Sequence, residues 1–175
     1  MEEKAIVHFE MLWKEARDEI KRRIEQRDKY SIQLSIALTA LVAISFAPTV
    51  SVAPKGLGTV LIAAPLVSIY FTFLILYSYR VHSVIAKYLR EELEPEMARL
   101  SGTSINKEWE TYYKTCETPG IRRQFFLWAL WAITALSLLY LWLTQLKELG
   151  LITLIFATIV YGVVEIVITR HFRKN

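Results

Sequence analysis

Apolar residues gather into four long runs along the chain, at residues 31–47, 57–77, 125–143 and 149–169. Each run approaches or reaches the ~20 residues that a helix needs to cross the hydrocarbon core of a bilayer. Prolines and glycines, among them Pro48 and Pro54, separate the first two runs, and a short segment separates the last two. The pattern predicts an all-α integral membrane protein, a four-helix bundle built from two transmembrane hairpins.

The first two spans are expected to continue beyond the membrane as helices. Apolar residues recur at three- and four-residue steps before the first run, so we expect one rod from about Ala5 to Ala47. The second helix is expected to run on to Glu94, because Pro95 forbids further regular helix. The remaining cytoplasmic features that we expect are a short helix over 95–100 closed by Gly102, a helix over 106–116, and a helix start at Thr118-Pro119.

The basic residues fix the expected orientation. Of the 21 lysines and arginines, 19 lie in residues 1–30, 80–123 and 170–175, whereas the two short connections hold one each. The positive-inside rule therefore predicts a multi-pass cell-membrane protein with both termini and the central loop in the cytoplasm. These polar parts are too short for a second core. We expect one membrane domain over residues 1–175, with a cytoplasmic amphipathic helix (1–30), a cytoplasmic helical loop (80–123) and a basic tail (170–175).

Composition excludes several classes of function. Hydrophobic residues make up 54% of the chain and the mean hydropathy is +0.31, too apolar for a water-soluble domain of this size. The basic residues lie where membrane topology places them, so we expect no nucleic-acid partner. A single cysteine, Cys116, allows no internal disulfide, and the three histidines lack the spacing of a metal motif. Because no catalytic motif is present either, we expect a non-enzymatic protein without a cofactor or metal.

Glu165 is the first candidate for a functional residue, because it is the only acid inside a predicted span. An intramembrane carboxylate is a functional hypothesis by default. Glu165 lies five residues before Arg170, roughly 7 Å along a helix. It can form an ion pair, handle ions or protons, or reach the interface unpaired. The basic side chains considered as ion-pair partners are Arg170, Arg122, Arg123, Arg80 and His82.

Gln33 is the second candidate intramembrane polar residue, one turn into the first span. Small residues recur at four-residue steps along the first span, as they do in the second span at Ser68 and Thr72. Such stripes let helix backbones approach closely in lipid, and they can also line a narrow polar pore. In the first span the stripe comprises Ser31, Ser35, Thr39, Ala43 and Ala47.

Basic and aromatic side chains at the cytoplasmic side have two interpretations each. A basic cluster precedes the first span, and each of its members can contact lipid headgroups or, in a ring of subunits, form a cationic vestibule. The aromatic residues Trp109, Tyr112 and Tyr113 are typical of an interfacial anchor or of a small helical core. The basic cluster comprises Lys21, Arg22, Arg23, Arg27 and Lys29.

Opposite charges on the two predicted helical extensions also suggest an ion-pair network that fixes their register. Exposed pairs of this kind contribute only ~0 to 1 kcal/mol each. The candidate network comprises Arg23, Arg27, Arg90, Glu91, Glu94 and Glu110.

Three segments resemble a scattered group of uncharacterised small prokaryotic membrane proteins, over about the first two-thirds of the chain. They are Glu19-Ile20 with Arg23 and Arg27-Asp28, the stretch from Tyr88 to Pro95, and the stretch from Trp109 to Tyr112. The resemblance implies no activity and draws attention to the cytoplasmic helices. A looser similarity is to the membrane-spanning effector domains of bacterial conflict systems, which implies pore formation.

Two classes of function follow from these features. In the first, the protein is a homo-oligomer in the lipid bilayer that encloses an ion path or acts as a pore-type effector. In the second, the spans are an anchor, and helices 5–29 and 80–116 recruit a cytoplasmic protein partner. The polar residues in the spans favour the first class, because a plain anchor does not require them.

Overall fold

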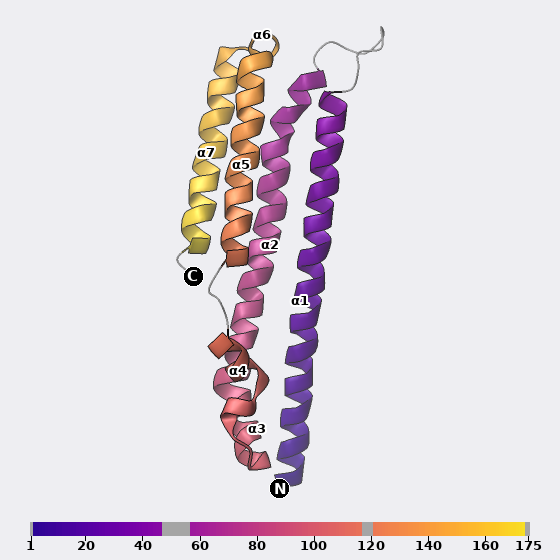
Figure 1. The fold of residues 1–175 in the computed structure, drawn as a ribbon, viewed down its shortest axis with the longest axis vertical. Coiled ribbons are helices and arrows are strands. Elements are labelled where there is room, and N and C mark those ends of the chain that lie inside the picture. The colour runs from indigo at the N-terminus through magenta and orange to yellow at the C-terminus, as the bar shows by residue number, and fades with distance from the viewer. Residues whose placement is uncertain (1, 47–56, 117–120, 174–175) are drawn as a thin grey trace. The chain divides into compact units, whose positions relative to one another are not determined.

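The computed structural model describes residues 2–46, 57–116 and 121–173 of the chain (Figure 1). Within these ranges every regular element is helical. The elements are α1 (Glu2–Ser45), η1 (Leu57–Ile62), α2 (Ala63–Tyr88), η2 (Leu89–Leu93), α3 (Glu94–Ser101), η3 (Ile105–Lys107), α4 (Trp109–Cys116), α5 (Ile121–Thr144), α6 (Leu146–Leu149) and α7 (Leu151–Arg173).

Three helical runs of the described chain are long and apolar enough to cross a membrane: Thr59–Ser101, Gln124–Thr144 and Leu151–Phe172. They contain most of three of the four predicted spans. The first predicted span, 31–47, is not among them, because the apolar part of α1 extends only from Ser31 to Ser45 within the described helix. This length is shorter than the ~20 residues of a full span.

The chain divides into two compact units, and α1 and α2 contribute residues to both. The first unit comprises Met1–Arg27 and Tyr77–Ile121, and the second comprises Asp28–Leu76 and Arg122–Asn175. The second unit therefore holds the apolar part of each long helix. We call them the polar unit and the apolar unit.

In the apolar unit, α2, α5 and α7 lie side by side, with α5 antiparallel to the other two (Figure 1). One cluster of buried side chains joins Leu76 of α2 to Leu130 of α5 and Ile168 of α7. A second cluster joins Ala64, Leu141 and Leu154 of the same three helices, with Leu38 and Leu41 of α1 packed against it. Large apolar side chains also cover the outside, as at Trp128, which is 74% exposed, and Ile152, which is 85% exposed. Such a surface suits lipid rather than water.

In the polar unit, the N-terminal half of α1 packs against the last turns of α2 and against η2. Ile20, Leu89 and Leu93 form the buried core, with Trp13 and Ile85 packed against it. The Ser78 hydroxyl donates a hydrogen bond to the Arg23 carbonyl oxygen, at 3.0 Å. The apolar face predicted for the start of α1 is therefore its packed face.

The predicted helix ends hold in part. Helix α1 spans Glu2–Ser45, close to the predicted 5–47, and α3 ends at Gly102 with φ 64°, as expected. The second helix does not end at Glu94 as expected: it continues from α2 through the π-helical turn η2 and past Pro95 into α3. A π-helical turn before the proline reduces the clash of its ring with the carbonyl four residues earlier. Thr118, Pro119 and the predicted first connection lie outside the described residues.

Two predicted helix starts are wrong. The helix expected over 106–116 begins only at Trp109, because Glu108 has an extended backbone (ψ 141°). The fourth apolar helix begins at Leu151 rather than at Leu149, because Gly150 has a φ of 76° that interrupts the helix after α6.

Candidate functional site

Glu165 is enclosed in the interior of the apolar unit, with 0% of its surface exposed. It lies on α7 in the same turn as Val164 and Ile168, which belong to the cluster around Leu130. The Thr134 hydroxyl of α5 donates a hydrogen bond to Oε1 of Glu165. The second carboxyl oxygen, Oε2, has no hydrogen-bond partner among the described residues.

Glu165 also has no ion-pair partner in the described part of the chain. Arg170 is exposed, and the side chains of Arg122 and Arg123 lie outside what the structure describes. Removing a carboxylate from water without a counter-charge is unfavourable, and for an acid at the centre of a bilayer it costs about 2.5 kcal/mol or more. The position of Glu165 therefore requires a compensating interaction.

Four buried hydroxyl groups belong to the same interior. Ser68 and Thr72 lie on one face of α2, four residues apart, and Thr134 and Ser137 lie on one face of α5. All four are at most 9% exposed, and the Ser68 hydroxyl, like Oε2 of Glu165, has no hydrogen-bond partner among the described residues.

The two core clusters set the level of these groups along the helices. We take Leu76 with Leu130, from one cluster, and Ala64 with Leu141, from the other, as two reference levels, and the hydrogen bond between Thr134 and Glu165 aligns α7 with them. Counting residues between the levels places Thr72, Thr134 and Glu165 together. It places Ser68 and Ser137 together about 6 Å away, one helical turn toward α6. We call these five residues the polar seam.

Polar contacts continue at both ends of the polar seam. Toward α6, the Tyr161 hydroxyl donates to the Ile62 carbonyl oxygen at 2.7 Å. Toward the C-terminus, Thr169 lies one turn beyond Glu165, and its hydroxyl accepts a hydrogen bond from the Trp131 indole at 3.0 Å. Hydrogen-bonding groups therefore continue beyond both ends of the polar seam, in a part-buried hydrogen bond at Tyr161 and an exposed one at Thr169.

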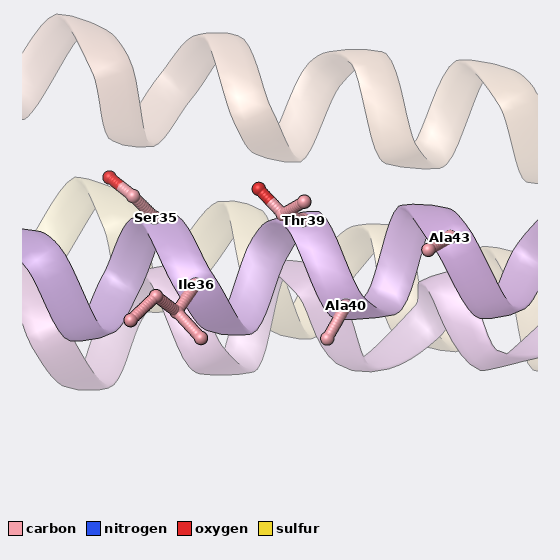
Figure 2. A pocket seen from close by; sticks show the side chains of 5 residues that line it. All are labelled: Ser35, Ile36, Thr39, Ala40 and Ala43. Carbon is pink, nitrogen blue, oxygen red and sulfur yellow. The ribbon is translucent and has the colours of Figure 1, made fainter.

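Gln33 is not part of this seam, because it is exposed on α1. The packed face of α1 carries Leu34, Leu38 and Leu41. The small residues of the same helix lie on the opposite face, where they line a shallow groove of about 420 Å³ (Figure 2). The lining residues are Ser35, Ile36, Thr39, Ala40 and Ala43. Much of the stripe predicted to support helix contacts therefore faces away from the other helices of its own chain.

Several residues of the candidate ion-pair network contact partners other than those expected. Arg23 donates from Nε to Glu19 on its own helix at 2.7 Å, and the Arg27 guanidinium lies 4.1 Å from the centre of the Tyr79 ring. Of the predicted set, Arg90 and Glu91 form an ion pair at 3.5 Å. Among the candidate lipid contacts, Lys21, Arg22 and Lys29 are exposed.

Glu94 has a role that the sequence did not reveal. Its side chain is fully buried, and its carboxylate accepts hydrogen bonds from three groups in the first turn of α4. The Glu110 amide donates at 2.7 Å, the Thr111 amide at 2.9 Å and the Thr111 hydroxyl at 2.7 Å. A carboxylate at a helix N-terminus satisfies free amides and complements the helix dipole. Glu94 therefore fixes the start of α4.

The negative charge of Glu94 also affects its surroundings. Burial and, secondarily, the charge of Glu94 raise the pKa of the Glu108 carboxyl above its ordinary value. Helix α4 in turn presents Trp109, Tyr112 and Tyr113, each about half exposed. The rings of Trp109 and Tyr113 are stacked, with 6.2 Å between their centroids. The three predicted aromatic residues are thus grouped on one short helix.

No group of histidine, cysteine and acidic side chains that could hold a metal ion is found in the described ranges. Comparison of the chain with protein-family models, curated protein sequences and solved structures gives no match. The candidate site is therefore the polar seam, defined by its geometry alone.

Proposed function

We propose that this is a non-enzymatic, oligomeric integral membrane protein through which ions pass, and that Glu165 binds the ion within the bilayer. The observation that carries the proposal is the full burial of Glu165 with Oε2 unpartnered among the described residues. A buried polar atom without a partner costs about 1–3 kcal/mol, and more when it is charged. A helix that only anchors a protein gains nothing from this cost.

We further propose that α1 crosses the membrane beside the three longer apolar helices. Leu38 and Leu41 pack against the cluster that contains Leu61 and Ala64 of the second helix, which supports an equal depth for both helices. With four spans, the distribution of basic residues supports a cytoplasmic location for both termini and for residues 80–123.

The outward groove on α1 supports association of several copies. In lipid, small residues at four-residue steps allow close approach of helices, and the groove lies opposite the face that packs within the chain. An oligomer built through this face would bring Gln33 of each copy near a shared interface, which is why Gln33 belongs in the test below.

Ion flux from liposomes that contain the purified full-length protein tests the proposal. We expect wild-type flux well above that of protein-free liposomes, and a changed flux for Glu165→Gln. Gln33→Leu separates a path at the subunit interface from one inside the chain. Thr153→Ala, an exposed hydroxyl on the same helix as Glu165, is the matched control. Folded oligomers that pass no cation or anion would refute the proposal.

A second candidate function, a membrane anchor that recruits a cytoplasmic protein, is favoured by one observation. Helix α4 holds three half-exposed aromatic side chains, and aromatic residues are enriched at protein interfaces. The double variant Tyr112→Ala, Tyr113→Ala would then lose a cytoplasmic partner that wild type retains after purification from its own membranes. Liposome flux would be absent from both proteins.

A further inference from the structure

We infer that the ion bound by Glu165 is a proton, and that each chain carries its own proton path along the polar seam. This inference rests on the proposed function and adds the identity of the ion and the location of its path. Its starting point is that Glu165, Ser68 and the other seam residues all belong to helices of one chain.

The lack of a neighbouring positive charge within the described ranges indicates that the Glu165 carboxylate binds a cation from solution. Among the described residues, no lysine, arginine or histidine forms an ion pair with Glu165. A charge at this depth needs a counter-charge in contact, because the surrounding side chains do not solvate it. A carboxylate therefore attracts a cation, and Oε2 is the oxygen that no neighbour occupies.

The surroundings of Glu165 favour a proton over a metal cation. Hard metal cations take about six or more oxygen ligands in proteins. At the level of Glu165 the polar seam offers only the hydroxyls of Thr72 and Thr134 beside the carboxylate, fewer oxygens than such a cation takes. Thr134 already donates its hydroxyl proton to Oε1. A proton requires only the single free oxygen Oε2.

The hydroxyl groups of the polar seam give the proton a route to Oε2. Ser68, whose hydroxyl has no partner among the described residues, lies one helical turn, about 6 Å along the helix axis, from the level of Glu165, and we place a bridging water between the two. The Ser68 oxygen accepts a proton from the α6 side and releases its own hydroxyl proton toward Oε2. The carboxylate becomes a neutral carboxylic acid.

Release of the proton completes the cycle. The acid gives its proton through a water to the Thr169 hydroxyl oxygen, one turn further along α7, Thr169 releases its own hydroxyl proton toward the C-terminal side, and Glu165 returns to the carboxylate. One proton crosses in each cycle, no covalent bond other than O–H is made or broken, and no group is oxidised or reduced. The direction follows the proton gradient.

The experiment measures proton flux into liposomes with a trapped pH-sensitive dye, driven by a potassium gradient with valinomycin. We expect wild-type flux to be the same in sodium and choline buffers. Glu165→Gln should reduce it about a hundredfold, the effect of removing a proton-transferring side chain. Ser68→Ala should reduce it severalfold, Glu165→Asp should retain part of it, and Thr153→Ala should match wild type.

Two further measurements do not depend on a single variant being well folded. Acidification of wild type should produce the infrared carbonyl band of a protonated carboxyl group that is missing in Glu165→Gln. In oligomers mixed from wild-type and Glu165→Gln chains, flux should fall in proportion to the variant fraction, because each chain has its own path. A much steeper fall would overturn the assignment of one path to each chain.

The outcomes separate this inference from the proposed function. Sodium, potassium or chloride flux that depends on Glu165, without proton flux, would overturn the inference and leave the proposed function intact. Proton flux that is unchanged in Glu165→Gln would overturn the inference as well. Folded protein that passes no ion at all would refute both.

Discussion

Removal of the Glu94 carboxylate should release α4 from the polar unit. In Glu94→Ala, two backbone amides and one hydroxyl at the start of α4 lose their acceptor. A hydrogen bond to a charged group contributes about 1.5–3 kcal/mol, and each buried donor left unpaired costs about 1–3 kcal/mol. The three bonds share one carboxylate, so their contributions do not simply add. We expect the docking of α4 to weaken by about 3–5 kcal/mol.

Hydrogen exchange measures this effect directly. Amides of α4 exchange when the helix opens locally, and 1.4 kcal/mol corresponds to about tenfold in the opening equilibrium. Exchange over residues 109–116 should therefore accelerate by about a hundredfold to a few thousandfold, or reach the rate of an unstructured chain. Glu94→Gln, which keeps a side-chain oxygen as acceptor, should have a smaller effect. Glu92→Ala, an exposed glutamate two residues earlier, is the matched control. Unchanged exchange in Glu94→Ala would refute the reasoning.

Three further predictions concern single positions. Because the pKa of Glu108 is raised by burial and by Glu94, the stability that a neutral Glu108 provides is present at low pH and lost as pH rises through that raised value. Glu108→Gln should therefore raise the melting temperature at pH 7 but not near pH 4, and equal gains at both pH values would contradict this. Gly150→Ala should destabilise the turn before α7 by about 1–2 kcal/mol, because a side chain is strained at φ 76°; thermal unfolding measures the change. Thr134→Val should lower thermal stability by about 1–3 kcal/mol, because Oε1 of Glu165 loses its donor; an unchanged melting temperature would show that the hydrogen bond adds no net stability.

The sequence predicts the features that depend on local pattern. The long helix α1, the packed face at its start and the end of α3 at Gly102 all follow from apolar spacing and from the conformational freedom of glycine. Three of the four predicted spans are confirmed as long apolar helices. The remaining span, 31–47 on α1, stays a prediction, because the apolar part of α1 extends to the limit of the described residues.

Features that depend on contacts distant in sequence were not predictable in the same way. The predicted start of α4 is too early because its capping group, Glu94, lies 16 residues before Glu110, where no local capping rule applies. Glu165 was identified from its residue type and position, but its donor Thr134 lies 31 residues away. The alignment of Ser68 with Ser137 required the packing of two antiparallel helices.

The hydrogen bonds at Glu94 have a consequence for which sequences can form the polar unit. Two of the three donors are backbone amides, which every residue except proline supplies. These two hydrogen bonds therefore do not depend on the side chains at positions 110 and 111, whereas position 94 must supply a side-chain acceptor of the right length. The two backbone hydrogen bonds thus restrict the sequence at position 94 more than on the helix that it holds.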